Sequence, residues 1–368
     1  MNLFVYLPHT TLNMIDMDTA WKEAEKLLEA LVSTPRTSRS ESRAADILQE
    51  HIAAHGYIPE RFGDNVMCRS RHFDPSRPAL LLNSHIDTVR PVSTWTRDPF
   101  TPVIENGRLY GLGTNDAGAS LVSLLYAFFI KDEIPNGPNM IFLATCQEEV
   151  SGAEGMKMMV SHLPEISVAI VGEPTGMQPA IAEKGLMVLD IDVHGKSGHA
   201  ARNEGINAIY RANEIITLLK DLKFEKESPL LGPVRLSVTM ISAGTQHNVI
   251  PDLCRLTADV RSNECYSNIE IFDTLKSYLP EWCDISARSF TLNSSRIPAE
   301  HPLIRRAVEL GLKPFGSPTL SDQAILSCPS FKMGPGDSAR SHSADEYISL
   351  DELEGAIKVY LSLLSDGF

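Results

Sequence analysis

The sequence has no long apolar run and no excess of positive charge. Its richest apolar stretch, SLVSLLYAFFI, ends at Lys131 and is shorter than the roughly 18 to 20 residues that cross a bilayer. The 368 residues include 33 Lys and Arg but 47 Asp and Glu, which gives a formal net charge of −14. A surface this acidic repels the phosphate backbone of nucleic acids. We therefore expect a soluble protein that binds neither membranes nor nucleic acids.

Closely spaced cysteines and a secretory signal are also missing. The six cysteines are far apart and include no CxxC pair, and a chain of this length needs no disulfide bonds to stabilise its core. The N-terminal segment MNLFVYLPHTTLNMIDMD lacks a basic region and contains Pro8 and His9, so it is not typical of a secretory signal. These features predict reduced thiols and a cytoplasmic protein.

Changes in hydrophobic periodicity divide the chain. Residues 18–33 and 40–55 carry apolar side chains at helical spacing, with Ser40 and Gly56 as the expected N-cap and C′ residues of the second helix. Between residues 78 and 181 the pattern changes to apolar runs that end in polar clusters: ALLLNSHID, NMIFLATCQEE and SVAIVGEP. Such runs are typical of strands buried on both faces of an α/β sheet, and their polar ends should meet at one edge.

A different pattern begins near residue 180. Polar and apolar residues alternate in MVLDIDVH, as in a strand with one buried face. Helical patterns separate further alternating segments, which gives the order strand, helix, strand, strand, helix, strand of a split βαβ unit. Helical patterns return after Asn293. We expect a discontinuous catalytic α/β domain, residues 1–179 and 293–368, with a smaller α/β sandwich inserted at residues 180–292.

Residues that could bind metal lie at the end of one predicted strand and in a glycine-rich segment. His85 and Asp87 in NSHIDTV project to the same side if the strand continues, and Asp87 could then orient the histidine. Asp116 lies in the glycine-rich segment YGLGTNDAGAS, where a carboxylate could bridge two cations. Taken one at a time, these residues are more often ordinary polar strand ends or turn residues.

More acidic residues and a second histidine follow other apolar runs. Glu148 and Glu149 come directly after IFLATCQ, and Glu173 comes after SVAIVG. His342 lies in the glycine-containing segment MGPGDSARSHSADE. Each residue alone is compatible with an exposed loop. A shared sheet edge that carries two histidines and four carboxylates, those of Asp116, Glu148, Glu149 and Glu173, is less easily explained, because the carboxylates repel one another unless cations compensate them.

These residues divide into two matching sets of ligands. His85, Asp116 and Glu173 would bind one metal ion. His342, Asp116 and Glu149 would bind the other, so that Asp116 bridges the two. Each ion then has one imidazole and two carboxylates, a nitrogen and oxygen set that suits zinc.

Glu148 is not needed as a ligand in this arrangement. Two divalent ions carry more charge than three carboxylates, and the surplus stabilises a hydroxide near neutral pH. Glu148 beside the ions would then be the general base that takes a proton from the attacking water.

The chain resembles the two-zinc metallopeptidase and deacylase family that contains acetylornithine deacetylase, succinyl-diaminopimelate desuccinylase, aminoacylase and glutamate carboxypeptidase. The matching segments occur in the family's order over nearly the whole chain: LVSTPRTSRSE, NSHIDTV, YGLGTNDAGAS, CQEEVSG, VGEPT, GKSGHAA, NVIPD, ADVRS and GPGDSARSHSADE. The resemblance implies a zinc-peptidase-like three-layer α/β/α catalytic domain. It also implies an inserted ferredoxin-like α/β sandwich that acts as a lid and as the dimerisation domain of a homodimer.

The resemblance also assigns roles to single residues. It implies the same five ligands for two Zn²⁺ ions, for which Co²⁺ could substitute, with Glu148 as general base and Asp87 as orienting carboxylate. It implies a cis peptide bond after Asp116. His199 corresponds to the lid histidine that stabilises the oxyanion. The chain departs from many relatives at residues 117–119, which affects the subfamily rather than the metal ligands. The residues expected to contact the substrate are Asn248, Arg261 and Gly336.

The reaction implied is hydrolysis of the N-acyl amide of a small amino acid. The segment GPGDSARSHSADEY most resembles acetylornithine deacetylase, which favours N-acetyl-L-ornithine, cleaved to L-ornithine and acetate in arginine biosynthesis. The alternatives are desuccinylation of N-succinyl-ornithine or N-succinyl-diaminopimelate, and a dipeptidase or aminoacylase. Lys184 and Arg340 are candidates to bind a succinyl carboxylate. A non-enzymatic alternative is a metal-free binding or assembly homologue, although all ligand positions are present.

Overall fold

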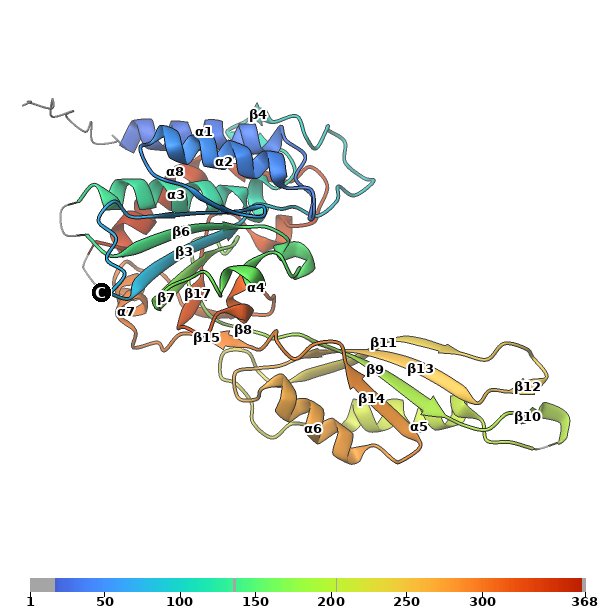
Figure 1. Cartoon of the computed structure of the whole chain (residues 1–368). Helices are drawn as coiled ribbons and strands as arrows, with labels where there is room; N and C mark the ends of the chain where they lie inside the picture. Colours follow the sequence, from blue (N-terminus) through green and yellow to red (C-terminus); the bar gives the residue numbers. More distant parts are fainter. Residues whose placement is uncertain (1–16, 135–136, 203, 366–368) are drawn as a thin grey trace, which may run out of the picture.

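A nine-stranded mixed sheet forms the framework of the larger part of the molecule (Figure 1). The structure is a computed structural model and describes residues 17–134, 137–202 and 204–365, so the segment considered as a secretory signal lies largely outside the described residues. Strand β3 runs parallel to both β6 and β7, and β7 is parallel to β17. Across the sheet the order is β1 (Glu60–Phe62), β2 (Asn65–Arg69), β6 (Met140–Thr145), β3 (Ala79–His85), β7 (Ile166–Gly172), β17 (Ser330–Lys332), β8 (Ala180–Glu183) and β15 (Ser295–Arg296), with β16 (Phe315–Ser317) paired to β8.

The central strands are buried on both faces, as their unbroken apolar runs predict. In β3, Leu80 and Leu82 join the core on one face, whereas Leu81 joins the core on the other. The first core is formed with α1 (Met17–Val32), α2 (Ser42–Ala54), α3 (Ala119–Asp132), α7 (Pro302–Glu309) and α8 (Leu350–Leu363). The second is covered by the single turn α4 (Met156–Met159) and adjoining loops. The predicted α/β fold class is confirmed, with a much thinner second layer of helix.

The second predicted helix begins later than its sequence indicates. The structure places Glu41 at the N-cap, so the assignment of Ser40 as the N-cap is wrong. The backbone N–H of Ser40 instead donates to Thr37 O at 2.8 Å, because the chain makes a further turn before the helix starts. Gly56 follows the helix with a φ of 80°, which confirms its predicted role at C′.

A four-stranded antiparallel sheet forms the second part of the molecule, which projects from the first in Figure 1. Its elements are β9 (Met187–His194), α5 (Ala208–Asp221), β11 (Arg235–Ala243), β13 (Leu253–Arg261), α6 (Asn268–Tyr278) and β14 (Cys283–Ala287). The strand order β11-β13-β9-β14 is that of a ferredoxin-like unit, and both helices pack on one face over a separate core. β8 lies in the large sheet although it falls within the predicted insert of residues 180–292, and those domain boundaries stay a prediction.

Two small sheets complete the fold. A two-stranded ladder of β10 (Gly198–His199) and β12 (Val249–Ile250) extends the far end of the second part (Figure 1). A three-stranded sheet of β18 (Tyr347–Ser349), β5 (Arg108–Tyr110) and β4 (Val103–Glu105) lies beside the first part. All six cysteines have free thiols. Within the described ranges, no helix combines the length and apolar character needed to cross a bilayer.

Candidate metal centre

The predicted metal ligands meet at the carboxyl edge of three neighbouring parallel strands. His85 is the last residue of β3, Glu173 directly follows β7, and the turn Glu148–Val150 follows β6. Because β6 and β7 both lie parallel to β3, these three ends share one edge of the sheet. Asp116 reaches the same edge from the turn Thr114–Gly118, which precedes α3.

The distances divide the ligands into two groups that share Asp116. In the first, His85 Nε2 lies 3.3 Å from Asp116 Oδ1 and 3.9 Å from Glu173 Oε1. In the second, His342 Nε2 lies 3.6 Å from Asp116 Oδ2 and 3.0 Å from Glu149 Oε2. The two carboxylate oxygens of Asp116 therefore approach two different histidines, which is the arrangement of a bridging ligand.

His85 is held with its Nε2 toward this centre. Its ring is nearly fully buried, and its Nδ1 lies 2.9 Å from the backbone oxygen of Asp87, so Nδ1 carries the proton and donates. The carboxylate of Asp87 is farther away, with Oδ1 3.6 Å from Nδ1. Asp87 thus orients the histidine mainly through its backbone carbonyl, a contact that the sequence does not reveal.

The Asp87 carboxylate also positions the two glutamates that follow β6. Its Oδ1 accepts a hydrogen bond from Glu148 N at 3.0 Å, and its Oδ2 accepts from Glu149 N at 3.2 Å and from Ser38 Oγ at 2.6 Å. Burial would raise the pKa of Asp87, but its contacts with His85 and these donors lower it. A charged Asp87 therefore links the strand end of His85 to the turn that carries Glu148 and Glu149.

Glu346 performs a similar task for the Asp116 loop and was missed in the sequence. Its buried carboxylate accepts hydrogen bonds from Gly113 N at 3.1 Å, Asn115 N at 2.8 Å and Asp116 N at 2.9 Å. The acidic pair at the end of GPGDSARSHSADE was the only available signal. The peptide bond between Asp116 and Ala117 is cis, as the family resemblance implied.

The electrostatics of the centre show how strongly it would favour a cation. Burial raises the pKa of Glu173 to about 8 and that of Glu148 well above its ordinary value. The hydrogen bond with Glu149 raises the pKa of His342 to about 9. Burial would lower the pKa of His85, but its interactions with acidic neighbours raise it. Glu148 and Glu173 thus keep their protons to a higher pH than ordinary glutamates do, and a metal ion bound there would displace these protons.

The donor atoms fit a metal ion. Glu149 Oε1 is buried and accepts no hydrogen bond from the described residues, which leaves this oxygen available to a metal ion. Two groups of residues each have ligand atoms that all lie within 4.8 Å of one another. One group is His85, Asp116 and Glu149, and the other is His85, Glu148 and Glu173. Glu148, the predicted general base, therefore lies directly beside the ligands. Imidazole and carboxylate donors suit zinc and related divalent ions.

A cavity of about 560 Å³ opens over this centre. Asp116, Glu148 and Glu173 line the cavity, together with residues 317–320 and 336–338. Gly336 is part of the wall, with a φ of 89°, and a Cβ there would come within 2.2 Å of Asn115 Oδ1; its contact with substrate stays a prediction. The dimensions suit a small-molecule ligand.

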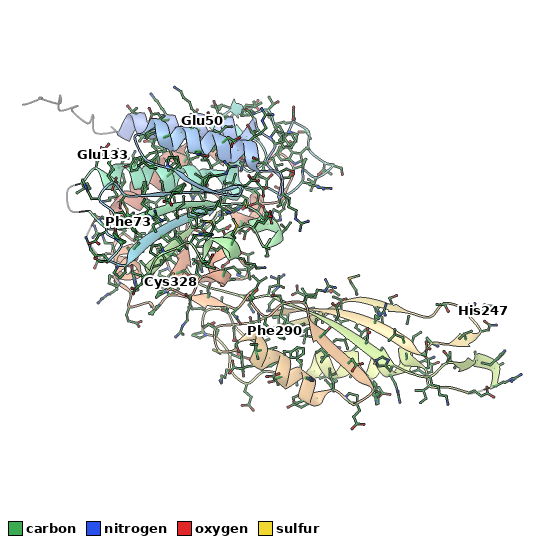
Figure 2. The ribbon with its side chains drawn as sticks, viewed as in Figure 1. Glu50, Phe73, Glu133, His247, Phe290 and Cys328 are labelled. Atoms are coloured by element: carbon green, nitrogen blue, oxygen red, sulfur yellow. The ribbon has the colours of Figure 1, made fainter. Side chains whose placement is uncertain are left out.

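The predicted residues of the insert lie away from this cavity in the same chain. His199 and Asn248 are both exposed and lie together in the β10–β12 region, where Ala200 N donates to Asn248 O at 3.1 Å. Figure 2 labels His247, the neighbour of Asn248, at the far tip of the second part. Arg261 ends β13 and pairs with Asp259, with 2.8 Å between Nε and Oδ1. None of the three predicted residues lines the cavity.

Comparison with known proteins agrees with this geometry. A family model described as peptidase family M20/M25/M40 matches residues 81–366. The chain belongs to this family. Like its M20 relatives, it is a metal-dependent amidohydrolase, and the clustered ligands support a metal cofactor.

Three M20 relatives illustrate the range of the similarity. The chain is 27% identical to acetylornithine deacetylase of Proteus mirabilis over 360 residues, 89% of this chain and 92% of that protein. It is also 27% identical to succinyl-diaminopimelate desuccinylase of Wolbachia pipientis over 356 residues, 87% of this chain and 88% of that protein. The Bacillus subtilis YXEP protein, a dinuclear metal-binding M20 peptidase, shares the fold with a TM-score of 0.72 at 16% identity, covering 94% of this chain and 98% of that one.

Proposed function

We propose that this protein hydrolyses the N-acyl amide of an amino acid with two Zn²⁺ ions, and that N-acetyl-L-ornithine is its substrate in arginine biosynthesis. The observation that carries the proposal is the placement of Asp116 between His85 and His342, with one carboxylate oxygen toward each histidine. Acetylornithine deacetylase of Proteus mirabilis, similar over 89% of this chain, supports the substrate. Co²⁺ could replace Zn²⁺ at such a site.

The chain would hold the two ions with separate ligand sets. His85 and Glu173 serve one ion, His342 and Glu149 serve the other, and Asp116 serves both. Bound there, divalent ions supply Lewis-acid polarisation of the amide carbonyl and a water of lowered pKa. His85 is held by a buried hydrogen bond to the backbone of Asp87, and Asp116 by the bond from its backbone N–H to Glu346, so these two ligands are positioned before substrate binds.

Glu148 is the proposed general base. It lies within 4.8 Å of His85 and Glu173, and burial raises its pKa well above the ordinary value for glutamate. A glutamate with a raised pKa is a stronger base toward water than an ordinary carboxylate, and the proton it takes up can then pass to the leaving amine, which is more basic still. The backbone N–H of Glu148 donates to Asp87, which fixes the residue beside the reacting groups.

The cations on the cavity wall favour a neutral acyl group. Arg340 donates to both carboxylate oxygens of Glu352, at 2.7 and 3.1 Å. Lys332 donates to Thr319 Oγ1 at 2.8 Å and lies 3.4 Å from Glu183. A succinyl carboxylate would have to compete with these existing carboxylate partners, whereas an acetyl group would not.

Lys184, the other candidate from the sequence, does not line the cavity. Its Nζ donates to Pro233 O at 2.9 Å. A desuccinylase acting on N-succinyl-ornithine or N-succinyl-diaminopimelate remains the second candidate, because the Wolbachia pipientis desuccinylase is equally similar in sequence. For a succinyl substrate, Arg340 would have to leave Glu352 so that its guanidinium could bind the carboxylate of the succinyl group.

The distant position of the insert residues supports a homodimer. The β10–β12 ladder, which contains His199 and directly follows Asn248 at β12, lies at the far end of the second part, and neither residue lines the cavity of its own chain. In a two-fold dimer formed through the insert, the tip of one subunit could reach the centre of the other and supply His199 to the oxyanion.

The free thiols of all six cysteines support a cytoplasmic location.

The proposed function is tested by a parallel substrate assay. Metal-loaded protein is assayed with N-acetyl-ornithine, N-succinyl-ornithine, N-succinyl-diaminopimelate and a dipeptide, and the values of kcat/KM are compared. We expect the largest value for N-acetyl-ornithine and loss of activity after chelation. A larger value for either succinyl substrate would assign the protein as a desuccinylase, and two equivalents of bound Zn²⁺ would establish the metal content.

A further inference from the structure

Arg36 is a buried arginine whose donors reach three separate segments of the chain. It lies between α1 and α2 and is only 1% exposed. Its Nε donates to Leu31 O at 3.2 Å, its Nη1 to Ile86 O at 2.5 Å, and its Nη2 to Gly113 O at 3.0 Å. The hydrolytic mechanism above makes no use of this residue.

Two of these acceptors belong to the segments that carry metal ligands. Ile86 lies between His85 and Asp87, so the hydrogen bond to its carbonyl connects Arg36 to the strand end that carries His85. Gly113 directly precedes the turn Thr114–Gly118 that contains Asp116. The guanidinium therefore spans the gap between a terminal ligand and the bridging ligand.

The Asp116 loop is shaped to admit this side chain. Gly113 has a φ of +75°, and a Cβ at this position would lie 2.6 Å from Arg36 Nη2. A Cβ on Gly118, at the other end of the same turn, would lie 3.2 Å from the same nitrogen. Glycine at both ends allows the turn to close around the guanidinium.

The charge of Arg36 is balanced within the same structure. Burial lowers the pKa of Arg36 to about 10, so it stays charged at neutral pH, and the nearby Glu346 and Asp87 favour the charged form. Glu346 accepts the amide hydrogens of the Asp116 loop, while Arg36 donates to a carbonyl of the same loop. The Arg36 guanidinium and the Glu346 carboxyl group thus hold the loop through its backbone carbonyl and its backbone N–H groups, respectively.

We propose that Arg36 is a positioning residue of the metal centre, whose guanidinium sets the spacing between the strand end of His85 and the loop of Asp116. This inference rests on the proposed metal-dependent function. Lysine cannot replace the arginine fully, because an ammonium lacks the planar fork that reaches three carbonyls in fixed directions. Groups that position metal ligands commonly change metal affinity about 10- to 100-fold when they are replaced.

The test compares Arg36→Lys and Arg36→Met with Arg61→Met as a matched control. Arg61 also donates to backbone carbonyls, of Ser42 and Gly63, but contacts no segment of the metal centre. Affinity for Co²⁺ and Zn²⁺ is measured by competition with a chromogenic chelator, and the visible spectrum of the Co²⁺-loaded protein reports the coordination geometry. Thermal unfolding of the metal-free proteins identifies any variant that does not fold.

We expect the Arg61→Met protein to bind Co²⁺ like the wild type. Arg36→Lys should bind about 10-fold more weakly and Arg36→Met up to about 100-fold more weakly, both with an altered Co²⁺ spectrum. If Arg36→Met does not fold, Arg36→Lys decides the question alone. Wild-type affinity and spectrum in a folded Arg36→Lys protein would overturn the inference. A wild-type protein that binds metal but cleaves no acyl amino acid or dipeptide would instead overturn the proposed function only.

Discussion

The nine-stranded and the four-stranded sheet both carry ion pairs, but one pair is buried and the other is exposed to solvent. On the four-stranded sheet, Arg288 and Asp190 lie 2.8 Å apart with 57% and 44% of their side chains exposed. Under the nine-stranded sheet's cavity, Lys332 and Glu183 lie 3.4 Å apart with 3% and 0% exposed. Water screens the first pair, whereas the second pair can be satisfied only by its protein partners.

The coverage of each sheet explains this difference. Helices α5 and α6 cover one face of the four-stranded sheet, so Asp190, Asp192 and His194 of β9 alternate onto a face in contact with solvent. Layers on both faces enclose the nine-stranded sheet, and its polar groups collect at one edge. The number of acidic residues therefore says little about function, while their burial at a strand end says much.

The largest expected effect separates the two regions by activity. Glu148→Gln removes the proposed base from the buried centre and should lower kcat by about 10²- to 10⁴-fold with little change in metal content. Asp190→Asn makes the same chemical change on the exposed sheet and should leave kcat unchanged. Steady-state kinetics of metal-loaded proteins, with metal analysis, provide the measurement. Near-normal turnover by the Glu148→Gln protein would remove this residue from the mechanism.

His199, at the tip of the insert, is exposed and yet is expected to be needed for activity. Both Glu148→Gln and His199→Ala homodimers should be nearly inactive if His199 acts in the partner's centre. Mixing and reassembling the two variants should restore activity to about a quarter of the wild type, because half of the random dimers then carry one intact site of two. The activity of the mixture is measured against its two parents, and a mixture that stays inactive would place His199 outside the partner's site.

The response to metal should depend on pH through the buried groups. In the metal-free protein, burial raises the pKa of Glu173 to about 8, so the folded state loses stability as pH rises from the ordinary value of 4.5 through 8. The contact with Glu149 raises the pKa of His342 to about 9, so its stabilising contribution is also lost as pH approaches 9. Metal binding replaces both protons.

The increase in Tm on adding Zn²⁺ should therefore be larger at pH 8.5 than at pH 6, by about 3–6 °C. Thermal unfolding of chelated and Zn²⁺-loaded protein measures this difference. Glu173→Gln should reduce the pH dependence, since its side chain does not titrate. An equal increase at both pH values would contradict the assignment of these groups to the metal centre.

The smallest effect is expected on the exposed sheet. Arg288→Ala removes both hydrogen bonds to Asp190, at 2.8 and 2.9 Å, yet should leave the free energy of unfolding nearly unchanged, because water screens this exposed pair. Urea denaturation of the metal-loaded protein measures the change. A clear loss of stability would show that this face is covered, for example by a second subunit.

Local patterns were sufficient to predict much of the fold. Apolar runs of β3, β6 and β7 identified buried strands, and alternation in β9 identified a half-covered one, because side-chain burial follows the period of the backbone. The start of α2 was predicted wrongly, since a single polar residue cannot show where an extra turn precedes a helix. The sequence also predicted only part of the role of Asp87, because it does not show that the carboxylate accepts hydrogen bonds from the backbone of Glu148 and Glu149.

The order of the elements and the residue types at the strand ends can be predicted from the sequence, because short segments with a clear period or motif carry both. The groups that hold those segments together become visible only in the folded chain. Arg36 and Glu346 meet the Asp116 loop from positions 77 and 230 residues away along the chain. Contacts of that separation depend on how the layers pack, and a single loop residue carries no periodic signal of its eventual partner.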